Sequence, residues 1–434
     1  MAELIYKPGE VRIENLAITN AKTGDTLDLT NFAAEINIYE DIFSPAIFGN
    51  IIISDAVNAI NTFPILGTEV INLRLRTPQL GTAIEGDFQL YAIEDRQLLT
   101  DREQSYRLAF ISREGYRDQV TNISKTFRGK THEIAAEIFS EYVQLDKDLI
   151  IGDTPHQSKI TYTSNFWTAF RNFNFLSKRS KGADLGANDF LFFETNSSFW
   201  WASTEWLIDE QLKNGLFEEY IYEPPGVELP RRVSGYNFVG AVLPPEFTQV
   251  EDIKIPKTMD LLEQQDSGFY SNGVRAFNFT TGEHFEKNFN AIEEWEKYVR
   301  TDKGSIIPAL VEKMPYSNVQ FIPLNSWVHN DYEFDDEYLE NPSQRQTYSN
   351  SFKQFKFQME VPGRTDIEVG KLIVVMFPNV KSKTIDDPQS MDMAFDELLT
   401  GPYLVTAINH KIDNAKHYMI LEIVKNGLTK SIGD

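Results

Sequence analysis

The chain has 434 residues, of which 41% are apolar, with no cysteine and a formal net charge of −23. A chain of this length and composition is expected to form about two to four domains with substantial cores, which excludes a disordered protein. No run of about 18 apolar residues is present, which excludes a membrane-spanning helix. The lack of cysteine excludes disulfides, thiolate metal sites and cysteine nucleophiles, and the acidic balance disfavours tight nucleic-acid binding.

Residues 11–111 are predicted to form a set of short β-strands. The segment 70–76 shows the pattern most clearly, because Ile71, Leu73 and Leu75 alternate with polar residues and therefore share one buried face. Further strands are predicted over Asp87–Arg96 and Ser105–Ser112. About five or six short strands in a hundred residues favour a small antiparallel barrel or sandwich.

The pattern changes to mixed α/β over residues 117–210. Apolar residues recur at helical spacing over His132–Val143. A second helix is predicted to begin with Ser164 as its N-cap and to end before Gly182. Its apolar stripe consists of Phe166, Phe170, Phe173 and Leu176. Two strands are predicted to follow, over 190–195 and 199–208.

Residues 242–341 are rich in proline, glycine and acidic residues. They contain an acidic run at 331–340 and a predicted amphipathic helix through Phe289, Ile292, Trp295 and Val299. Regular β alternation then resumes and ends in a hairpin over Gly401–Leu428, with its turn at 413–416. The predicted inner face of the hairpin carries Leu404, Ile408, Ile412, Met419, Leu421 and Ile423.

These patterns predict a β-rich α+β protein with two antiparallel β blocks and inserted α/β domains. The first block is expected over residues 1–116 and an α/β domain over 117–210. The second block is expected to be split between 211–250 and 352–434, with an acidic, mixed domain over 251–351 inserted between its two parts.

The histidines form no complete metal or catalytic motif. His132 opens a stretch similar to a zinc-protease helix, but the second histidine of that motif would fall at Ala136. His410 and His417 are expected to face each other across the terminal hairpin, which offers two ligands for a metal. Because no third ligand is nearby, a satisfied surface pair is favoured.

The acidic residues allow two functional interpretations, and neither is specific. Asp331, Glu333 and Asp335 alternate as in a calcium loop. The glycine and glutamate that such a loop needs are replaced by Asp336 and Pro342, so a solvated acidic loop is favoured. A glycosidase needs two carboxylates at a fixed separation, and the 64 acidic residues single out no pair.

Other chemical motifs are missing. Trp200 and Trp201 offer a surface for stacking sugars, although strand packing or a subunit contact is favoured. No glycine-rich phosphate loop follows a strand and opens a helix, and no G-x-S-x-G turn is present. The sequence therefore predicts no catalytic, cofactor-binding or metal-binding residue.

Several ordered phrases resemble the baseplate central hub proteins of contractile-tail bacteriophages. They lie at 36–76, 95–139 and 162–180 and in the closing hairpin, and the resemblance is weakest over 242–341. The family phrases E-D-x-F-S-P-x-x-x-G-x-x-x-I-x-D and P-I-x-G-x-E are matched by Glu40, Asp41, Phe43, Ser44, Pro45, Gly49, Ile53, Asp55, Pro64, Ile65, Gly67 and Glu69. The family's helix opening T-S-x-F is matched by Thr163, Ser164 and Phe166.

The resemblance implies two tube-protein-like β-barrels per chain and a structural role without enzymatic activity. A homotrimer would present six barrels in a pseudo-sixfold ring. The ring would join the tail tube, or a tube-initiator protein, to the central spike protein, with other baseplate proteins around it. Genome DNA would pass along its axis. The resemblance further implies assembly in the host cytoplasm, a place in the virion tail baseplate, no cofactor and no stable membrane insertion.

Two alternatives remain open. A spike-base protein of a contractile secretion system would share the fold, but such a chain is expected to continue into a long β-helix or OB-like segment. A secreted polysaccharide-degrading enzyme would use paired carboxylates with Trp200 and Trp201. The N-terminus lacks the basic start and apolar core expected of a signal peptide for such an enzyme.

Overall fold

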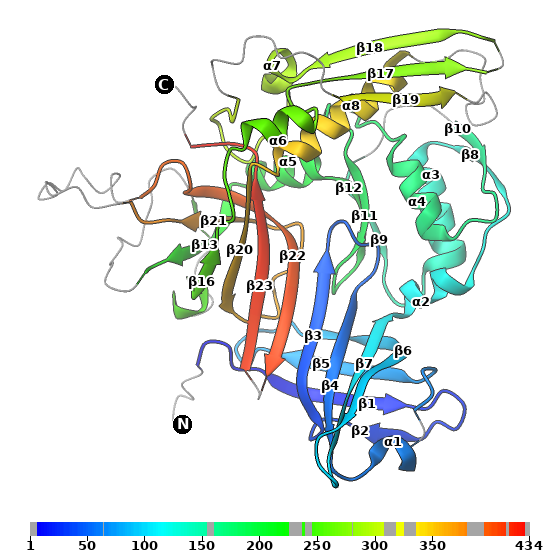
Figure 1. The fold of residues 1–434 in the computed structure, drawn as a ribbon, viewed down its shortest axis with the longest axis vertical. Helices are drawn as coiled ribbons and strands as arrows, with labels where there is room; N and C mark the ends of the chain where they lie inside the picture. Colours follow the sequence, from blue (N-terminus) through cyan, green and yellow to red (C-terminus); the bar gives the residue numbers. More distant parts are fainter. Residues whose placement is uncertain are drawn as a thin grey trace, which may run out of the picture.

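The computed structural model describes residues 7–63, 65–153, 160–224, 237–238, 245–279, 281–307, 318–324, 336–379, 395–413 and 416–429. Long strands run through the middle of the molecule, with a small separate sheet at one end and helices to one side (Figure 1). The predicted β-rich α+β class is confirmed. No helix within these described ranges is long and apolar enough to cross a membrane.

The first β block consists of seven strands and one short helix, all antiparallel where they pair. Ile71, Leu73 and Leu75 are buried, as their alternation predicts. The elements are β1 (Arg12–Thr19), β2 (Thr26–Asp28), β3 (Ala33–Asp41), β4 (Phe48–Asp55), α1 (Ala59–Thr62), β5 (Val70–Arg76), β6 (Ile84–Leu98) and β7 (Gln104–Ser112).

The mixed α/β region follows directly after β7. Its elements are α2 (Arg113–Val120), β8 (Thr126–Gly129), α3 (Thr131–Ile138), β9 (Leu149–Ile151), β10 (Ile160–Thr163), α4 (Ala169–Ser177), β11 (Phe190–Glu194), β12 (Phe199–Ser203) and α5 (Thr204–Asn214). A five-residue π-helical turn, Phe139–Val143, extends α3. The helix predicted over His132–Val143 is therefore present in two consecutive parts.

Two predicted boundaries in this region are wrong. Helix α4 begins after Thr168, whose side chain accepts a hydrogen bond from the Arg171 amide, whereas the Ser164 hydroxyl donates to the Ile123 carbonyl. Phe166 precedes the helix, has a φ of 58° and is 69% exposed, so it does not belong to the apolar stripe. The second predicted strand ends at Ser203, which caps α5 by accepting from the Trp206 amide.

The second β block combines strands from both sides of a long insertion. β13 (Leu216–Tyr222) lies parallel to β21 (Leu372–Met376), which pairs with the terminal hairpin. The hairpin strands are β22 (Gly401–Asp413) and β23 (Lys416–Lys425), and β20 (Phe355–Pro362) flanks β23. Three short strands complete the block: β14 (Asn237–Phe238), β15 (Gln249–Val250) and β16 (Asp252–Lys254).

The insertion forms a small sheet covered by one helix. β17 (Ser271–Asn278) lies between β18 (His284–Asn290) and β19 (Asn318–Leu324), and α8 (Asp336–Ser351) packs against β17 and β18. Two short helices, α6 (Leu261–Asp266) and α7 (Ala291–Glu294), accompany it. The helix predicted through Phe289, Ile292, Trp295 and Val299 is present only in part. Phe289 lies in β18 and pairs with β17, whereas α7 and a 3-10 helix over Trp295–Lys297 contain Ile292 and Trp295. Within the acidic run, 331–335 lie outside the described residues and Asp336 begins α8.

Both β blocks join in one 15-stranded sheet. The junction is the antiparallel pairing of β3 with β22, which runs from Asp41 opposite Ala407 to Glu35 opposite Asp413. Among the described strands, the main path of this sheet is open and ends at β14 and β2. The two β blocks therefore share one backbone hydrogen-bond network.

A β-bulge corrects one predicted face of the hairpin. Val405 pairs with Ile423 and Ala407 with Glu422, so Thr406 is the extra residue. A bulge shifts the alternation of a strand by one residue. As a result Val405, rather than the predicted Leu404, shares a face with Ile408 and Ile412. Leu404 is nevertheless buried, because both faces of the hairpin are covered near its start.

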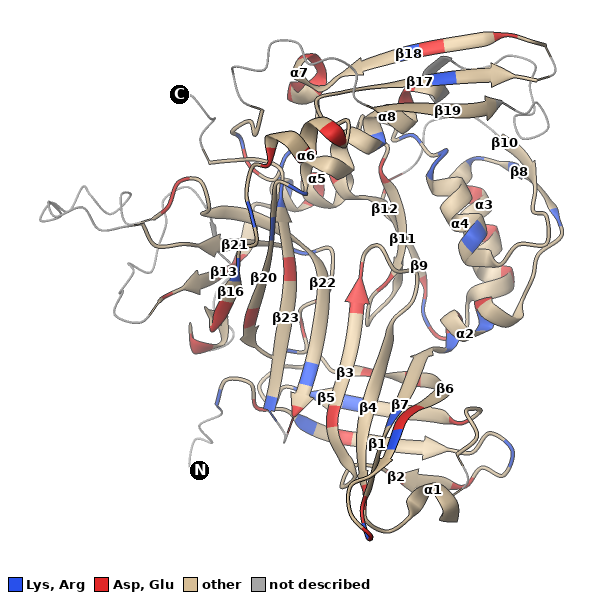
Figure 2. Cartoon of the chain, viewed as in Figure 1, with Lys and Arg blue, Asp and Glu red and all other residues tan. Residues whose placement is uncertain are grey.

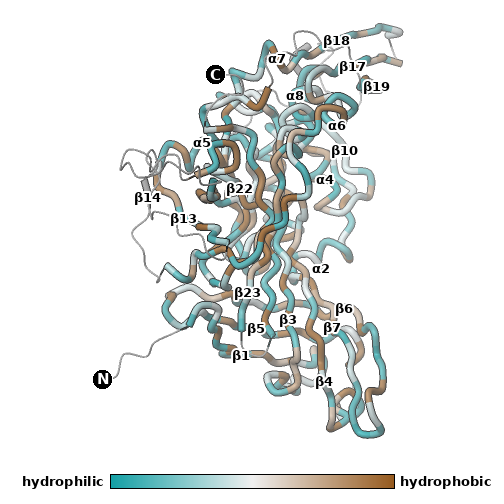
Figure 3. Tube along the Cα trace, turned by 60° about the vertical axis from the view of Figure 1, so that its left-hand side comes forward, coloured by the Kyte–Doolittle hydropathy of each residue, from teal (hydrophilic) through white to brown (hydrophobic). Residues whose placement is uncertain are grey.

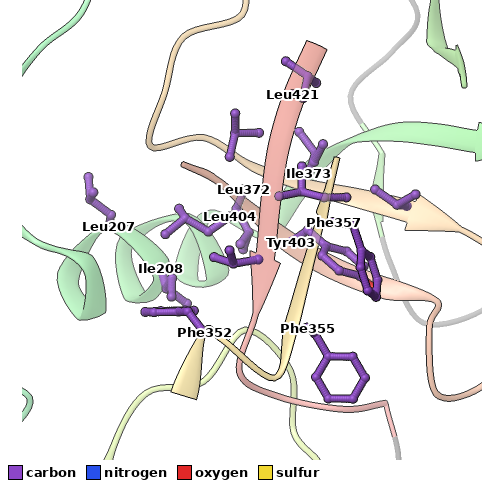
Figure 4. Packing of buried hydrophobic residues seen from close by; sticks show 14 of the residues in the cluster. Leu207, Ile208, Phe352, Phe355, Phe357, Leu372, Ile373, Tyr403, Leu404 and Leu421 are labelled. Carbon is purple, nitrogen blue, oxygen red and sulfur yellow. The ribbon is translucent and has the colours of Figure 1, made fainter. Parts of the chain in front are cut away.

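The hydrophobic core follows the two β blocks. One cluster fills the first block, and a larger one lies under β20–β23 and contacts α5 through Leu207 and Ile208. Figure 4 shows Phe357, Leu372 and Tyr403 grouped in this larger cluster. Hydrophobic and hydrophilic residues alternate along the central strands (Figure 3), which is the pattern of a sheet that buries one face.

Candidate functional site: a polar sheet face

Eight neighbouring strands form a continuous antiparallel surface in the order β16–β20–β23–β22–β3–β4–β7–β6. A single row of paired residues crosses all eight of them. The row consists of Asp252, Glu360, Ile420, Asn409, Tyr39, Phe48, Ile111 and Gln89. We call the face on which these side chains lie the polar sheet face.

The two faces of this surface differ sharply in burial. Residues at alternate positions, such as Asn409 and Lys411 on β22 or Asn50 and Ile52 on β4, are partly exposed on the polar sheet face. The residues between them are buried in the core clusters. Because side chains alternate along a strand, a regular register across eight strands produces one broad solvent-facing wall.

The polar sheet face carries more acidic than basic side chains. Its nine carboxylates belong to Glu35, Asp41, Glu85, Asp87, Glu94, Asp252, Glu360, Asp413 and Glu422. Its five cations belong to Arg107, Lys254, Lys356, Lys411 and Lys416. These give a net charge of 5 − 9 = −4. Figure 2 shows acidic and basic residues on these strands.

Ion pairs between neighbouring strands neutralise part of this charge. Lys411 Nζ on β22 lies 3.1 Å from Glu35 Oε2 on β3, and Lys356 Nζ on β20 lies 2.7 Å from Glu422 Oε2 on β23. Lysines held by neighbouring carboxylates are less available to an outside anion. The surface therefore presents a weakly negative field with few free cations, which does not attract a phosphate backbone.

The buried side of the β3–β22 junction holds an unusual polar cluster. Glu40, His410 and His417 are all fully buried. His410 Nδ1 lies 3.1 Å from His417 Nε2, and His410 Nε2 lies 3.8 Å from Glu40 Oε1. The two histidines do face each other across the hairpin, but the predicted surface pair is wrong because the pair lies in the core.

The environment of this cluster favours uncharged side chains. Burial, together with the nearby negative charge of Glu368, raises the pKa of Glu40 to about 8. Burial lowers the pKa of His410 to about 3, and burial with the adjacent His410 lowers the pKa of His417 well below its usual value. Both pKa shifts favour the uncharged forms of Glu40 and His410 over an ion pair between them.

The other residues considered in the sequence lie apart from one another. His132 is half-buried on α3, and burial lowers its pKa. Trp201 is fully buried against Phe173 and Phe190, and Trp200 stacks on Phe193 with ring centroids 6.4 Å apart. Asp331, Glu333 and Asp335 lie outside the described residues. Within the part of the chain that is described, no group of three or more His, Asp or Glu side chains is placed to hold a metal ion.

Sequence patterns alone did not identify the polar sheet face. Alternation indicates which residues of one strand share a face, but it does not order the strands. The order depends on the β3–β22 pairing, which joins segments about 370 residues apart in the chain. The sequence does show alternating polar positions in the strands of both β blocks. Only the register between the strands reveals that these positions form one surface.

Comparisons with known proteins give a likeness of fold. No family model matches the chain, and no curated protein matches its sequence. The 43 kDa tail protein of prophage MuSo2 from Shewanella oneidensis superposes with a TM-score of 0.55 at 9% identity, covering 95% of this chain and 98% of that protein. The tail protein from Neisseria meningitidis MC58 superposes with a TM-score of 0.52 at 9% identity, covering 96% and 98%. The chain thus has the fold of phage tail proteins, as the sequence resemblance predicts.

Proposed function

We propose that the protein is a structural baseplate hub of a contractile phage tail, without catalytic activity. In this proposal three copies form a ring that joins the tail tube to the central spike, with other baseplate proteins around it and DNA passing along the axis. The two β blocks, 1–116 and 211–250 with 352–434, serve as the two tube-like units of each copy. The domains over 117–210 and 251–351 flank them.

The strand directions of the eight-stranded surface carry this proposal. Every pairing in it is antiparallel, and eight is an even number, so β16 and β6 at its two edges run in opposite directions. The half of β6 that is free of β5, from Tyr91 onward, can therefore pair antiparallel with the β16 edge of the next copy, displaced along the strand direction, and the alternation continues without interruption. Three copies would contribute 3 × 8 = 24 strands to one closed wall, which would leave no exposed edge.

Both edges have features that suit a contact between copies. The pairing of β6 with β5 ends at Gln89, so from Tyr91 onward β6 pairs with β7 alone among the described strands. This free half of β6 exposes Tyr91 and Leu98, at 51% and 80%. Beside β16, Ile255 is 38% exposed and Leu262 is 80% exposed. Apolar side chains at a free strand edge favour burial against another chain.

The polar sheet face would then line the channel. Its net charge of −4 per copy, with Lys356 and Lys411 already paired to carboxylates, would let a phosphate backbone pass without binding. The location in the virion tail and the assembly in the host cytoplasm are part of this proposal. The location in the virion tail is supported by the likeness in fold to the two tail proteins.

The native mass of the purified protein tests the ring. Three chains of 49.8 kDa give 3 × 49.8 = 149.4 kDa, and light scattering is expected to give about this mass. Obligate interfaces commonly bury more than about 2,000 Å², so the trimer should persist on dilution. A monomer of 49.8 kDa at every concentration, alone and with a spike protein, would overturn the proposal.

A further inference from the structure

The small sheet of the insertion has a free edge at β19. Among the described strands, β19 pairs only with β17, in parallel register from Asn272 opposite Asn318 to Asn278 opposite Leu324. The backbone groups on the outer side of β19 therefore have no strand partner in the described part of the chain. Such an edge can accept a further extended segment through main-chain hydrogen bonds.

A basic hollow of about 440 Å³ lies beside this edge, on the side of the sheet that is turned toward α4 (Figure 1). Gln320 and Ile322 of β19 line one part of it. The other lining residues come from the end of α4 and from α8, and they are Lys178, Arg179, Pro342, Arg345, Gln346 and Ser349. Three of these side chains are cations, and none of the described residues that line the hollow is acidic. We call this hollow the basic cleft.

Backbone carbonyls hold the two arginines in the wall of the basic cleft. Arg345 Nη1 donates to the Phe190 carbonyl at 2.9 Å and to the Ser177 carbonyl at 3.2 Å. Arg179 Nη1 donates to the Phe175 carbonyl at 3.1 Å, and its guanidinium lies 3.6 Å from the centroid of the Phe175 ring. These contacts fix where the guanidinium groups lie, but a neutral carbonyl does not cancel their charge.

Lys178 and Arg345 keep a positive charge that an outside anion can meet. Lys178 is exposed, and neither residue forms an ion pair with a carboxylate in the described part of the chain. Burial lowers the pKa of Arg345, and the charge of Asp189 acts in the opposite direction. Burial also raises the pKa of Asp189, which favours its uncharged form. In a chain with a net charge of −23, the basic cleft is thus a local excess of positive charge.

The other side of β19 is apolar and exposed. Val319 is 36% exposed and Phe321 is 81% exposed, and both alternate with the two residues of β19 that line the basic cleft. Neighbouring strands place their side chains on the same two faces of a sheet. A strand added to β19 would therefore place every second side chain over the basic cleft and the others beside Val319 and Phe321.

We infer that the β19 edge binds an extended segment of a partner protein in which acidic and apolar residues alternate. The segment adds a strand to the sheet of the insertion, with its carboxylates against Lys178 and Arg345 and its apolar side chains over Phe321. A free strand edge favours a polypeptide over a nucleic acid, whose backbone cannot continue a sheet. This site is separate from the β6 and β16 edges at which copies of the chain are proposed to meet.

A synthetic peptide that alternates glutamate and valine tests this site on the full chain. Calorimetry measures its dissociation constant, and hydrogen–deuterium exchange measures the protection of Asn318–Leu324. We expect binding with slower exchange over this strand. Lys178→Glu and Phe321→Asp are each expected to raise the dissociation constant about tenfold. Lys22→Glu is the matched control, because it makes the same charge change at an exposed lysine in the turn after β1 and should leave binding unchanged.

Further ligands separate charge, strand addition and other occupants. Equal binding of a peptide with lysine in place of glutamate would overturn the role of the basic cleft. Two peptides N-methylated on one or the other set of alternate residues test the added strand, and undiminished binding of both would overturn it. Tighter binding of a single-stranded oligonucleotide would overturn the choice of a protein partner. Protection of β19 that rises with protein concentration without peptide would assign the edge to a second copy, and no binding of the acidic peptide would overturn the inference outright.

Discussion

Gly363→Ala is expected to lower the free energy of unfolding by about 3 kcal/mol or more, because overpacking of a filled core is costly. Gly363 follows the end of β20 and lies against the ring of His417. A Cβ added there would lie far inside van der Waals contact of three ring atoms. The ring has little room to yield, since the His417 backbone is bonded on both sides. Its carbonyl accepts from the Gly363 amide at 2.8 Å, and its amide donates to the Gly9 carbonyl at 2.7 Å.

The measurement is chemical denaturation of Gly363→Ala beside Gly81→Ala. Gly81 is the matched control, because a Cβ there would meet nothing within 4 Å. We expect the Gly81 variant to unfold at nearly the same denaturant concentration as the natural chain. A Gly363 variant within about 1 kcal/mol of the natural chain would contradict the tight packing around His417.

Glu40→Gln is expected to stabilise the protein at neutral pH and to leave it unchanged at pH 4. The pKa of Glu40 is raised from 4.5 to about 8 in the folded state. Between these two pKa values the Glu40 carboxyl is ionised in the unfolded chain but protonated in the folded chain. The contribution of Glu40 to the free energy of unfolding is therefore fully present below the unfolded pKa. It is lost as the pH rises through the folded pKa. At about 1.4 kcal/mol per pH unit, an amide that cannot ionise should gain about 3 kcal/mol near pH 7.

Thermal or chemical unfolding between pH 4 and pH 9 measures this gain. The difference between Glu40→Gln and the natural chain should grow with pH and level off above pH 8. Glu397→Gln serves as control, because it makes the same chemical change at an exposed side chain. A Glu40 variant that is less stable at pH 7, or a difference that does not vary with pH, would contradict an uncharged Glu40 in the core.

Much of the secondary structure could be predicted because alternation is a local signal. The strand at 70–76 and the alternating residues of β20 follow directly from the order of apolar and polar side chains. The closing hairpin follows as well, and its two strands pair as far as Asp413 opposite Lys416. In each case one strand face is buried, so the period of two appears in the sequence itself.

The errors arise where a tertiary contact decides the outcome. Phe289 lies at helical spacing with its neighbours, yet pairing with β17 makes it part of a strand. Because of the bulge at Thr406, Val405 rather than Leu404 lies on the same face of the hairpin as Ile408. The sequence of a single strand does not show where such an extra residue lies. Serine is a common N-cap residue, but the Ser164 hydroxyl donates a hydrogen bond to the Ile123 carbonyl. The side chain of Thr168 caps the helix instead.

The candidate site depended even more on tertiary structure. His410 and His417 were correctly expected to face each other, because they lie on the two paired strands of the hairpin. Their burial depends on β3 and β20 covering the two outer edges of the hairpin and on the core beneath it. The polar sheet face likewise exists only because β3 pairs with β22, a contact between the two β blocks that neither block encodes alone.

Electron microscopy of the purified assembly tests the central proposal most directly. The account predicts threefold rings with a central opening, in which the polar sheet faces of the three copies line the wall and each β6 edge lies beside the β16 edge of the next copy. Single chains, or an assembly in which the polar sheet face points outward and β6 and β16 remain apart, would contradict it.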